Sequence, residues 1–102
     1  MPFDPEDCRS MEQVREGIDA ADEALVALIA LRFDYMDAAA RLKTERATVR
    51  DEARKAAVLA HVQAEAEARG VDPALVARLW DELIEASIAY ELKEWDELHP
   101  DE

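Results

Sequence analysis

The 102-residue sequence has few of the residues that interrupt helices. It contains two glycines and four prolines, and no proline lies between Pro5 and Pro73. No segment alternates apolar and polar residues in the manner of a half-buried strand. These absences exclude a chain built on sheets and predict one all-α domain over residues 10–98. We expect an irregular lead at residues 1–9 and a short tail at residues 99–102.

Cysteine and long apolar runs are also scarce. Cys8 is the single cysteine, which excludes an internal disulfide and suits a reducing compartment. The longest uninterrupted apolar stretch, Ala24–Leu31, is too short to cross a membrane. The start of the chain is acidic, so no signal peptide is expected. We therefore expect a cytoplasmic protein that does not contact membranes.

Cations are outnumbered, with 12 Lys and Arg against 25 Asp and Glu and a net charge of −13. Nucleic acids need a basic face, so they are not expected as partners. There is no glycine-rich phosphate loop, and His61 and His99 show no metal-ligand spacing. We expect no metal and no cofactor. Any cation on an apolar helix face is therefore a candidate for function.

The pattern of apolar residues predicts one long helix from Ser10 to Arg46. Ser10 and Gln13 fit a capping box at its start. Apolar residues then recur every three or four positions, which is the pattern of a single helical face. We call this face the stripe, and its members are Met11, Val14, Ile18, Ala21, Leu25, Leu28, Arg32, Tyr35, Ala39 and Leu42. Arg32 is its one charged member.

The length of this helix argues for a homodimer. A helix of roughly 36 residues spans about 54 Å, whereas a compact chain of this size is only about 35 Å across. Much of the stripe would be exposed in a compact monomer, and a second copy of the chain would cover it. The alternative is a break near Leu31–Asp34, which would give an ordinary monomeric bundle.

Two further helices are expected, at residues 51–69 and 73–98. Asp51 is a suitable N-cap for the first of them, and Gly70 stands where a left-handed residue commonly ends a helix. Asp72 followed by Pro73 is an N-cap with proline at the first helical position. The chain is therefore expected to contain three helices.

Two polar residues, Ser87 and Glu91, interrupt the apolar face of the last helix. A serine commonly bonds its own helix backbone, whereas a glutamate there either pairs with an internal cation or is solvated at a frayed helix end. Arg32 and Lys43 are eleven residues apart, so they face one side of the first helix. Two interpretations are open. We expect either that Arg32 pairs with Glu91 or another carboxylate inside the bundle, or that the cations face a cavity for an anionic ligand. An antiparallel second copy would bring its Arg15 near them.

Five short motifs, in this order and spacing, resemble the all-α chorismate mutases, three-helix chains that form an intertwined dimer. The motifs are Val14-Arg15-x-x-Ile18-Asp19-x-x-Asp22, Leu28-x-x-x-Arg32, Ala38-Ala39-Ala40-Arg41-x-Lys43, Val49-Arg50-Asp51-x-x-Arg54 and Leu83-Ile84-Glu85-x-Ser87-Ile88. The resemblance covers the chain from about Pro5 to Trp95. It implies the rearrangement of chorismate to prephenate in phenylalanine and tyrosine biosynthesis. This pericyclic reaction needs no base, nucleophile or metal, only correct positioning and charge complementarity.

The resemblance also implies a pocket for a dicarboxylate with an enol ether, chorismate. The residues implied are Arg32, Lys43, Arg54, Ser87 and Glu91 of one chain and Arg15 of the other. Arg15 and Arg32 would hold carboxylates, for which the planar guanidinium is suited. Lys43 and Glu91 would face the breaking ether oxygen from two sides. Ser87 would lie near a substrate carboxylate.

The chain departs from the mutase pattern at two positions. Many members have glutamine where Glu91 stands, and a glutamate donates a hydrogen bond only while protonated. We therefore expect activity to fall as the pH rises and Glu91→Gln to flatten the profile. Lys55 occupies the substrate-binding position at which many mutases have a glutamate for the substrate hydroxyl. Asp51 and Glu52 are the candidates to replace that contact.

Two other interpretations remain open. The same cationic pocket is used by isochorismate pyruvate lyases of salicylate formation, which have glutamine at the position of Glu91. Those lyases carry bulky aromatics near Ala86 and Ser87, so the small pair here favours the mutase. The other interpretation is a non-catalytic helical dimer in which Arg32 and Glu91 pair with each other. The segments that resemble the lyases are Pro5–Cys8, Asp34-Tyr35 and Lys93–Trp95.

Overall fold

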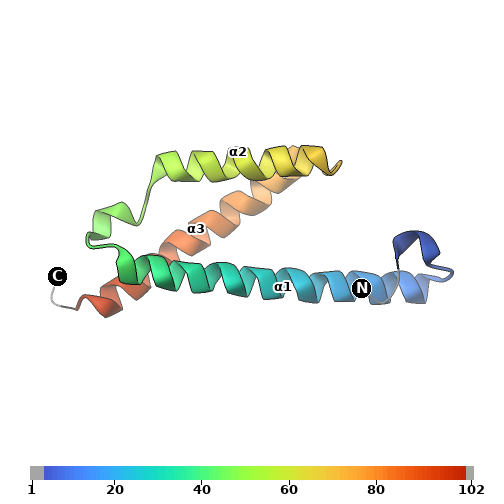
Figure 1. Cartoon of the computed structure of the whole chain (residues 1–102), viewed down its shortest axis with the longest axis horizontal. Coiled ribbons are helices and arrows are strands. Elements are labelled where there is room, and N and C mark those ends of the chain that lie inside the picture. The colour runs from blue at the N-terminus through green and yellow to red at the C-terminus, as the bar shows by residue number, and fades with distance from the viewer. Residues whose placement is uncertain (1–3, 101–102) are drawn as a thin grey trace. The chain divides into compact units, whose positions relative to one another are not determined.

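A computed structural model describes residues 4–100, and over that range the protein contains helices and no strands (Figure 1). The all-α prediction is confirmed. The elements are η1 (Pro5–Asp7), α1 (Met11–Leu42), η2 (Arg46–Thr48), α2 (Glu52–Ala68) and α3 (Pro73–Leu98). The chain divides into two compact units, residues 1–35 and 36–102. The ends of the predicted lead and tail, residues 1–3 and 101–102, lie outside the described residues.

The first unit begins with a capped helix start. Ser10 Oγ accepts a hydrogen bond from the Gln13 N–H at 3.2 Å, as the capping box predicts. The Gln13 side chain reaches one residue further back than expected, because its Oε1 accepts from the Arg9 N–H at 2.6 Å. The lead, predicted to be irregular, contains the short 3-10 helix η1. These local bonds set where α1 begins.

The stripe on α1 is largely exposed in the single chain. Ile18, Leu25 and Leu28 expose 52%, 55% and 61% of their surface. α1 is continuous from Met11 to Leu42, so the break considered near Leu31–Asp34 is absent. Burial of the apolar surface of the stripe would be favourable by about 25 cal/mol per Å².

The end of α1 corrects the sequence prediction. The helix was expected to reach Arg46, but it ends at Leu42. The Lys43 carbonyl accepts a hydrogen bond from the Trp95 indole of α3 at 3.0 Å. This tertiary bond occupies the carbonyl that would accept from the Ala47 N–H if the helix continued, and the chain instead forms η2. Periodicity alone does not reveal such a contact.

The turn between α2 and α3 has the predicted chemistry. Asp51 caps α2 by accepting from the Arg54 N–H at 2.9 Å, and Asp72 caps α3 by accepting from the Ala74 N–H at 2.9 Å. Gly70 has φ +72°, the left-handed conformation that ends α2. The Val71 N–H then bonds the Ala66 carbonyl at 2.9 Å. α2 and α3 pack against each other on either side of this turn (Figure 1).

The core lies in the second unit and is built around α3. Its buried apolar members are Ala40, Val49, Ile84, Ile88 and Trp95, with Val58, Leu59, Trp80 and Leu92 packed against them. The buried residues of α3 all belong to the predicted apolar face, and they include its two polar members, Ser87 and Glu91. None of the helices in the described part of the chain has both the length and the apolar character needed to span a membrane.

Candidate active site

A buried ion pair between Lys43 and Glu91 is the centre of the candidate site. Lys43 Nζ lies 2.8 Å from Glu91 Oε2. The Glu91 side chain is 5% exposed, whereas that of Lys43 is 30% exposed. Of the two alternatives for Glu91, pairing with an internal cation is therefore observed. Because a buried carboxylate without a partner is strongly unfavourable, this contact constrains both residues.

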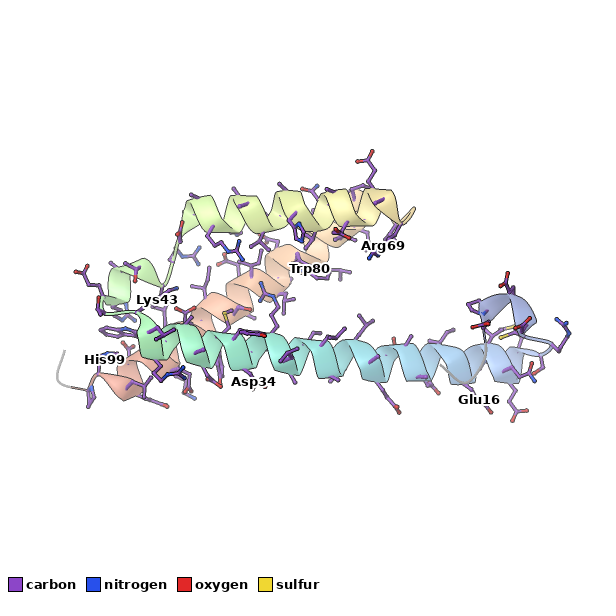
Figure 2. The ribbon with its side chains drawn as sticks, viewed as in Figure 1. Glu16, Asp34, Lys43, Arg69, Trp80 and His99 are labelled. Atoms are coloured by element: carbon purple, nitrogen blue, oxygen red, sulfur yellow. The ribbon has the colours of Figure 1, made fainter. Side chains whose placement is uncertain are left out.

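Two helices position the pair. Lys43 directly follows α1, and its N–H bonds the Ala39 carbonyl at 2.9 Å. Glu91 lies on the buried face of α3. The Tyr90 hydroxyl donates to Asp37 Oδ1 at 2.6 Å, which directly links α3 to the C-terminal part of α1. Figure 2 shows Lys43 at this end of α1.

Ser87 lies one helical turn before Glu91 on the same buried face of α3. Its hydroxyl donates to the Leu83 carbonyl at 2.6 Å. This backbone bond is the one expected of a serine inside a helix. The structure therefore brings Lys43, Glu91 and Ser87 into one unit, with Ser87 and Glu91 adjacent on one helix.

Lys55 binds two carboxylates of α3 and is not a lone cation. Its Nζ lies 2.8 Å from both Asp81 Oδ1 and Glu85 Oε2. The hydrogen bonds that Lys55 donates to Asp81 and then to Glu85 raise its pKa to about 12. A charge-neutralised ammonium offers no acceptor for a substrate hydroxyl. The assignment of Lys55 to substrate binding stays a prediction.

Glu85 also binds Arg50, and sequence reasoning did not anticipate this link. The guanidinium makes two hydrogen bonds to the carboxylate, at 2.6 and 3.2 Å. The Arg50 hydrogen bond, followed by that of Lys55, lowers the pKa of Glu85 to about 2. The sequence holds one signal for such a site: Asp81 and Glu85 are like charges four residues apart, an arrangement that a shared cation stabilises.

The two candidates for hydroxyl recognition already form other bonds. Asp51 caps α2 through the Arg54 N–H, and Glu52 Oε1 accepts from Arg50 at 2.9 Å. The side chain of Arg54 is exposed. Whether these residues contact a substrate stays a prediction.

The remaining predicted residues, Arg15 and Arg32, lie on α1 in the first unit. Arg15 is exposed and Arg32 is half-buried. Their assignment to the same site as Lys43 stays a prediction. Over residues 4–100, no group of three or more His, Cys, Asp or Glu side chains is arranged to hold a metal ion.

Comparison with known proteins shows the family. The profile of the chorismate mutase type II family matches residues 14–92, a range that contains every predicted site residue from Arg15 to Glu91. The chain belongs to this family, and the resemblance stated from its motifs is confirmed. An isochorismate pyruvate lyase from Pseudomonas aeruginosa is 36% identical to it over 91 residues, which cover 89% of this chain and 90% of the relative.

Stability should depend on pH through Glu85. Its pKa in the folded protein, about 2, is below the ordinary value of 4.5. Its contribution is therefore fully present above about pH 4.5 and is lost as the pH falls toward 2. We predict that the free energy of unfolding, measured with urea at pH 6 and pH 3, falls less in Glu85→Gln than in the wild type. The effect should be modest because the carboxylate is 40% exposed.

The matched control for this prediction is Glu82→Gln. Glu82 is an exposed glutamate on the same helix, and it has no ion pair among the described residues. This variant should lose as much stability between the two pH values as the wild type does. Equal losses in the wild type and Glu85→Gln would contradict the prediction.

Proposed function

We propose that this protein is a chorismate mutase that converts chorismate to prephenate. The reaction breaks the enol-ether C–O bond and forms a C–C bond within one molecule. The family supplies the substrate class, and the single observation that carries the proposal is the buried contact of Lys43 with Glu91. A cation and a carboxyl that meet at one point can approach the same substrate atom from two sides.

In the proposed reaction, negative charge grows on the breaking ether oxygen. Lys43 donates a hydrogen bond to this oxygen, and Glu91 donates a second one in its protonated form. In the empty protein the Lys43 ammonium donates to Glu91 at 2.8 Å, so substrate binding exchanges that acceptor for the ether oxygen. Removing one preorganised donor of this kind typically costs about 10²–10³-fold in rate.

The remaining predicted residues bind the rest of the substrate. Arg32 and the Arg15 of a second chain hold the two carboxylates, assisted by Arg54. Ser87 lies near one carboxylate, since it is one turn from Glu91 on the buried face of α3. The chain then catalyses by holding the compact reactive conformer and by charge complementarity.

The single cysteine suits the proposed setting, the cytoplasm.

A second candidate is isochorismate pyruvate lyase activity. The curated relative named for that activity supports it. The resemblance described above places glutamine at position 91 and aromatics near positions 86 and 87 in such lyases. Here those positions hold Glu91, Ala86 and Ser87. The small pair Ala86 and Ser87 favours the mutase, whereas Glu91 departs from the glutamine of both classes.

Turnover on the two substrates separates these functions. Purified protein is offered chorismate and isochorismate separately, and the reaction is followed by ultraviolet absorbance. We expect prephenate from chorismate, with the rate reduced about 10²-fold in Arg32→Ala, because a charge-assisted hydrogen bond contributes up to about 3 kcal/mol. Salicylate and pyruvate from isochorismate, without prephenate, would establish the lyase instead. No turnover by the folded protein would support a non-catalytic dimer.

The pH profile tests the role of Glu91. We predict that kcat/KM for chorismate falls as the pH rises, because an ionised carboxylate cannot donate to the ether oxygen. Glu91→Gln keeps the size of the side chain and donates at every pH, so its profile should be flat. Glu85→Gln, at the exposed network on the same helix, serves as the control and should keep the slope. A wild-type profile that is flat from pH 5 to 9 would rule out this role.

We also propose that the protein works as a homodimer, supported by the exposed stripe of α1. Arg15→Ala and Lys43→Ala chains should each be inactive alone. Unfolding and refolding them together should restore about a quarter of wild-type activity, because half the dimers are mixed and one of their two sites is intact. If both residues served the same chain's site, mixing would restore none.

A further inference from the structure

Trp95 is the most deeply buried aromatic residue among those that line the core of the second unit, at 3% exposure. Its indole N–H is a donor that must find an acceptor when buried. The acceptor is the Lys43 carbonyl, at 3.0 Å. This carbonyl directly follows α1, where the helix no longer supplies a backbone partner. The bond therefore satisfies two groups that would otherwise be unpaired.

Lys43 is held at three points. Its N–H bonds Ala39, its carbonyl accepts from Trp95, and its ammonium donates to Glu91. Glu91 and Trp95 are four residues apart on α3, so one helix face holds both the main chain and the side chain of the lysine. When a substrate oxygen replaces Glu91 as acceptor, the side-chain contact changes. The two main-chain bonds of Lys43 can persist through the reaction, and the one from Trp95 is the bond that ties this backbone to α3.

The indole is also held by His99, the residue that directly follows α3. The His99 ring stacks on it with centroids 4.0 Å apart and an interplanar angle of 18°. His99 Nδ1 and the His99 N–H lie 2.9 and 3.0 Å from the Trp95 carbonyl. A carbonyl oxygen only accepts, so Nδ1 carries the proton in this bond. Figure 2 shows His99 at the C-terminal end of α3, the end whose Trp95 bonds Lys43.

We infer that Trp95 is a positioning residue for Lys43: its indole N–H fixes the backbone from which the lysine side chain extends, and thereby the position of the ammonium. The inference rests on the proposed function of Lys43. The lysine stem is flexible, so the position of the ammonium is fixed only by its two anchors together: the backbone from which it extends and its contact with Glu91. Misplacement of a reacting group by about 1 Å can cost about 10²-fold in rate.

The first test compares Trp95→Phe with Trp80→Phe. Trp80 is half-buried against the same core, and its indole has no hydrogen bond among the described residues. Trp95→Phe should lower kcat about tenfold with KM changed less than about twofold, since Lys43 acts in the transition state. Trp80→Phe should keep kcat within about twofold at a temperature where both variants are folded. Equal losses of kcat in the two variants would overturn the inference.

A second variant keeps the shape of the side chain. Replacing Trp95 by 3-benzothienylalanine puts sulfur in place of the indole N–H and retains the bicyclic ring, so packing against the core is preserved. This variant should reproduce the tenfold loss of kcat. Full activity would mean that the ring and not its N–H matters, and the inference would be wrong.

A spectroscopic measurement separates this inference from the proposed function. In ¹⁵N NMR of the empty wild-type protein, the Lys43 ammonium should give a distinct hydrogen-bonded signal. That signal should move toward the value of free lysine in both Trp95 variants and stay in place in Trp80→Phe. If it moves equally in the Trp80 and Trp95 variants, the inference fails. Absence of turnover in the wild type with the expected NMR changes would reject the proposed function and retain the positioning role.

Discussion

The structure of the second unit depends on one electrostatic requirement: a carboxylate on the buried face of α3 must meet a cation. Glu91 is 4% exposed, and an ionised group so buried is tolerated only with a partner. Lys43 supplies that partner from the end of α1. Two further side chains of α3 donate hydrogen bonds to this part of the chain: Tyr90 bonds Asp37, and Trp95 bonds the Lys43 carbonyl. The contact of Lys43 with Glu91 therefore lies beside the core, pairs a buried charge and forms the centre of the candidate site.

The helices were largely predictable because their signals are local. Asp51, Gly70 and Asp72 act through neighbouring backbone groups, and the buried face of α3 follows from helical periodicity. The end of α1 was mispredicted, and the Trp95 indole that bonds the carbonyl just after it lies more than fifty residues away in the sequence. Local patterns carry no information on such a partner.

The candidate site was predictable in part for the same reason. Glu91 could be singled out because a charge on an apolar face is a local anomaly. Its partner could not, since Arg32 and Lys43 share one helical side and only the folded chain shows that Lys43 is 2.8 Å from it. Lys55 was placed from the resemblance as a substrate-binding residue. Its contacts with Asp81 and Glu85 depend on how α2 faces α3.

The choice of glutamate at position 91 affects both stability and catalysis. The carboxylate neutralises Lys43, which a glutamine could not do, so its replacement would leave the ammonium without its ionic partner. In the proposed reaction, a substrate would displace this carboxylate from the ammonium before its ether oxygen could accept the same hydrogen bond. Part of the binding energy offsets this exchange, and the carboxyl must gain a proton before it can donate. Under the proposed function, the ion pair with Lys43 and catalysis therefore make opposing demands on this residue, a conflict that is typical of functional sites.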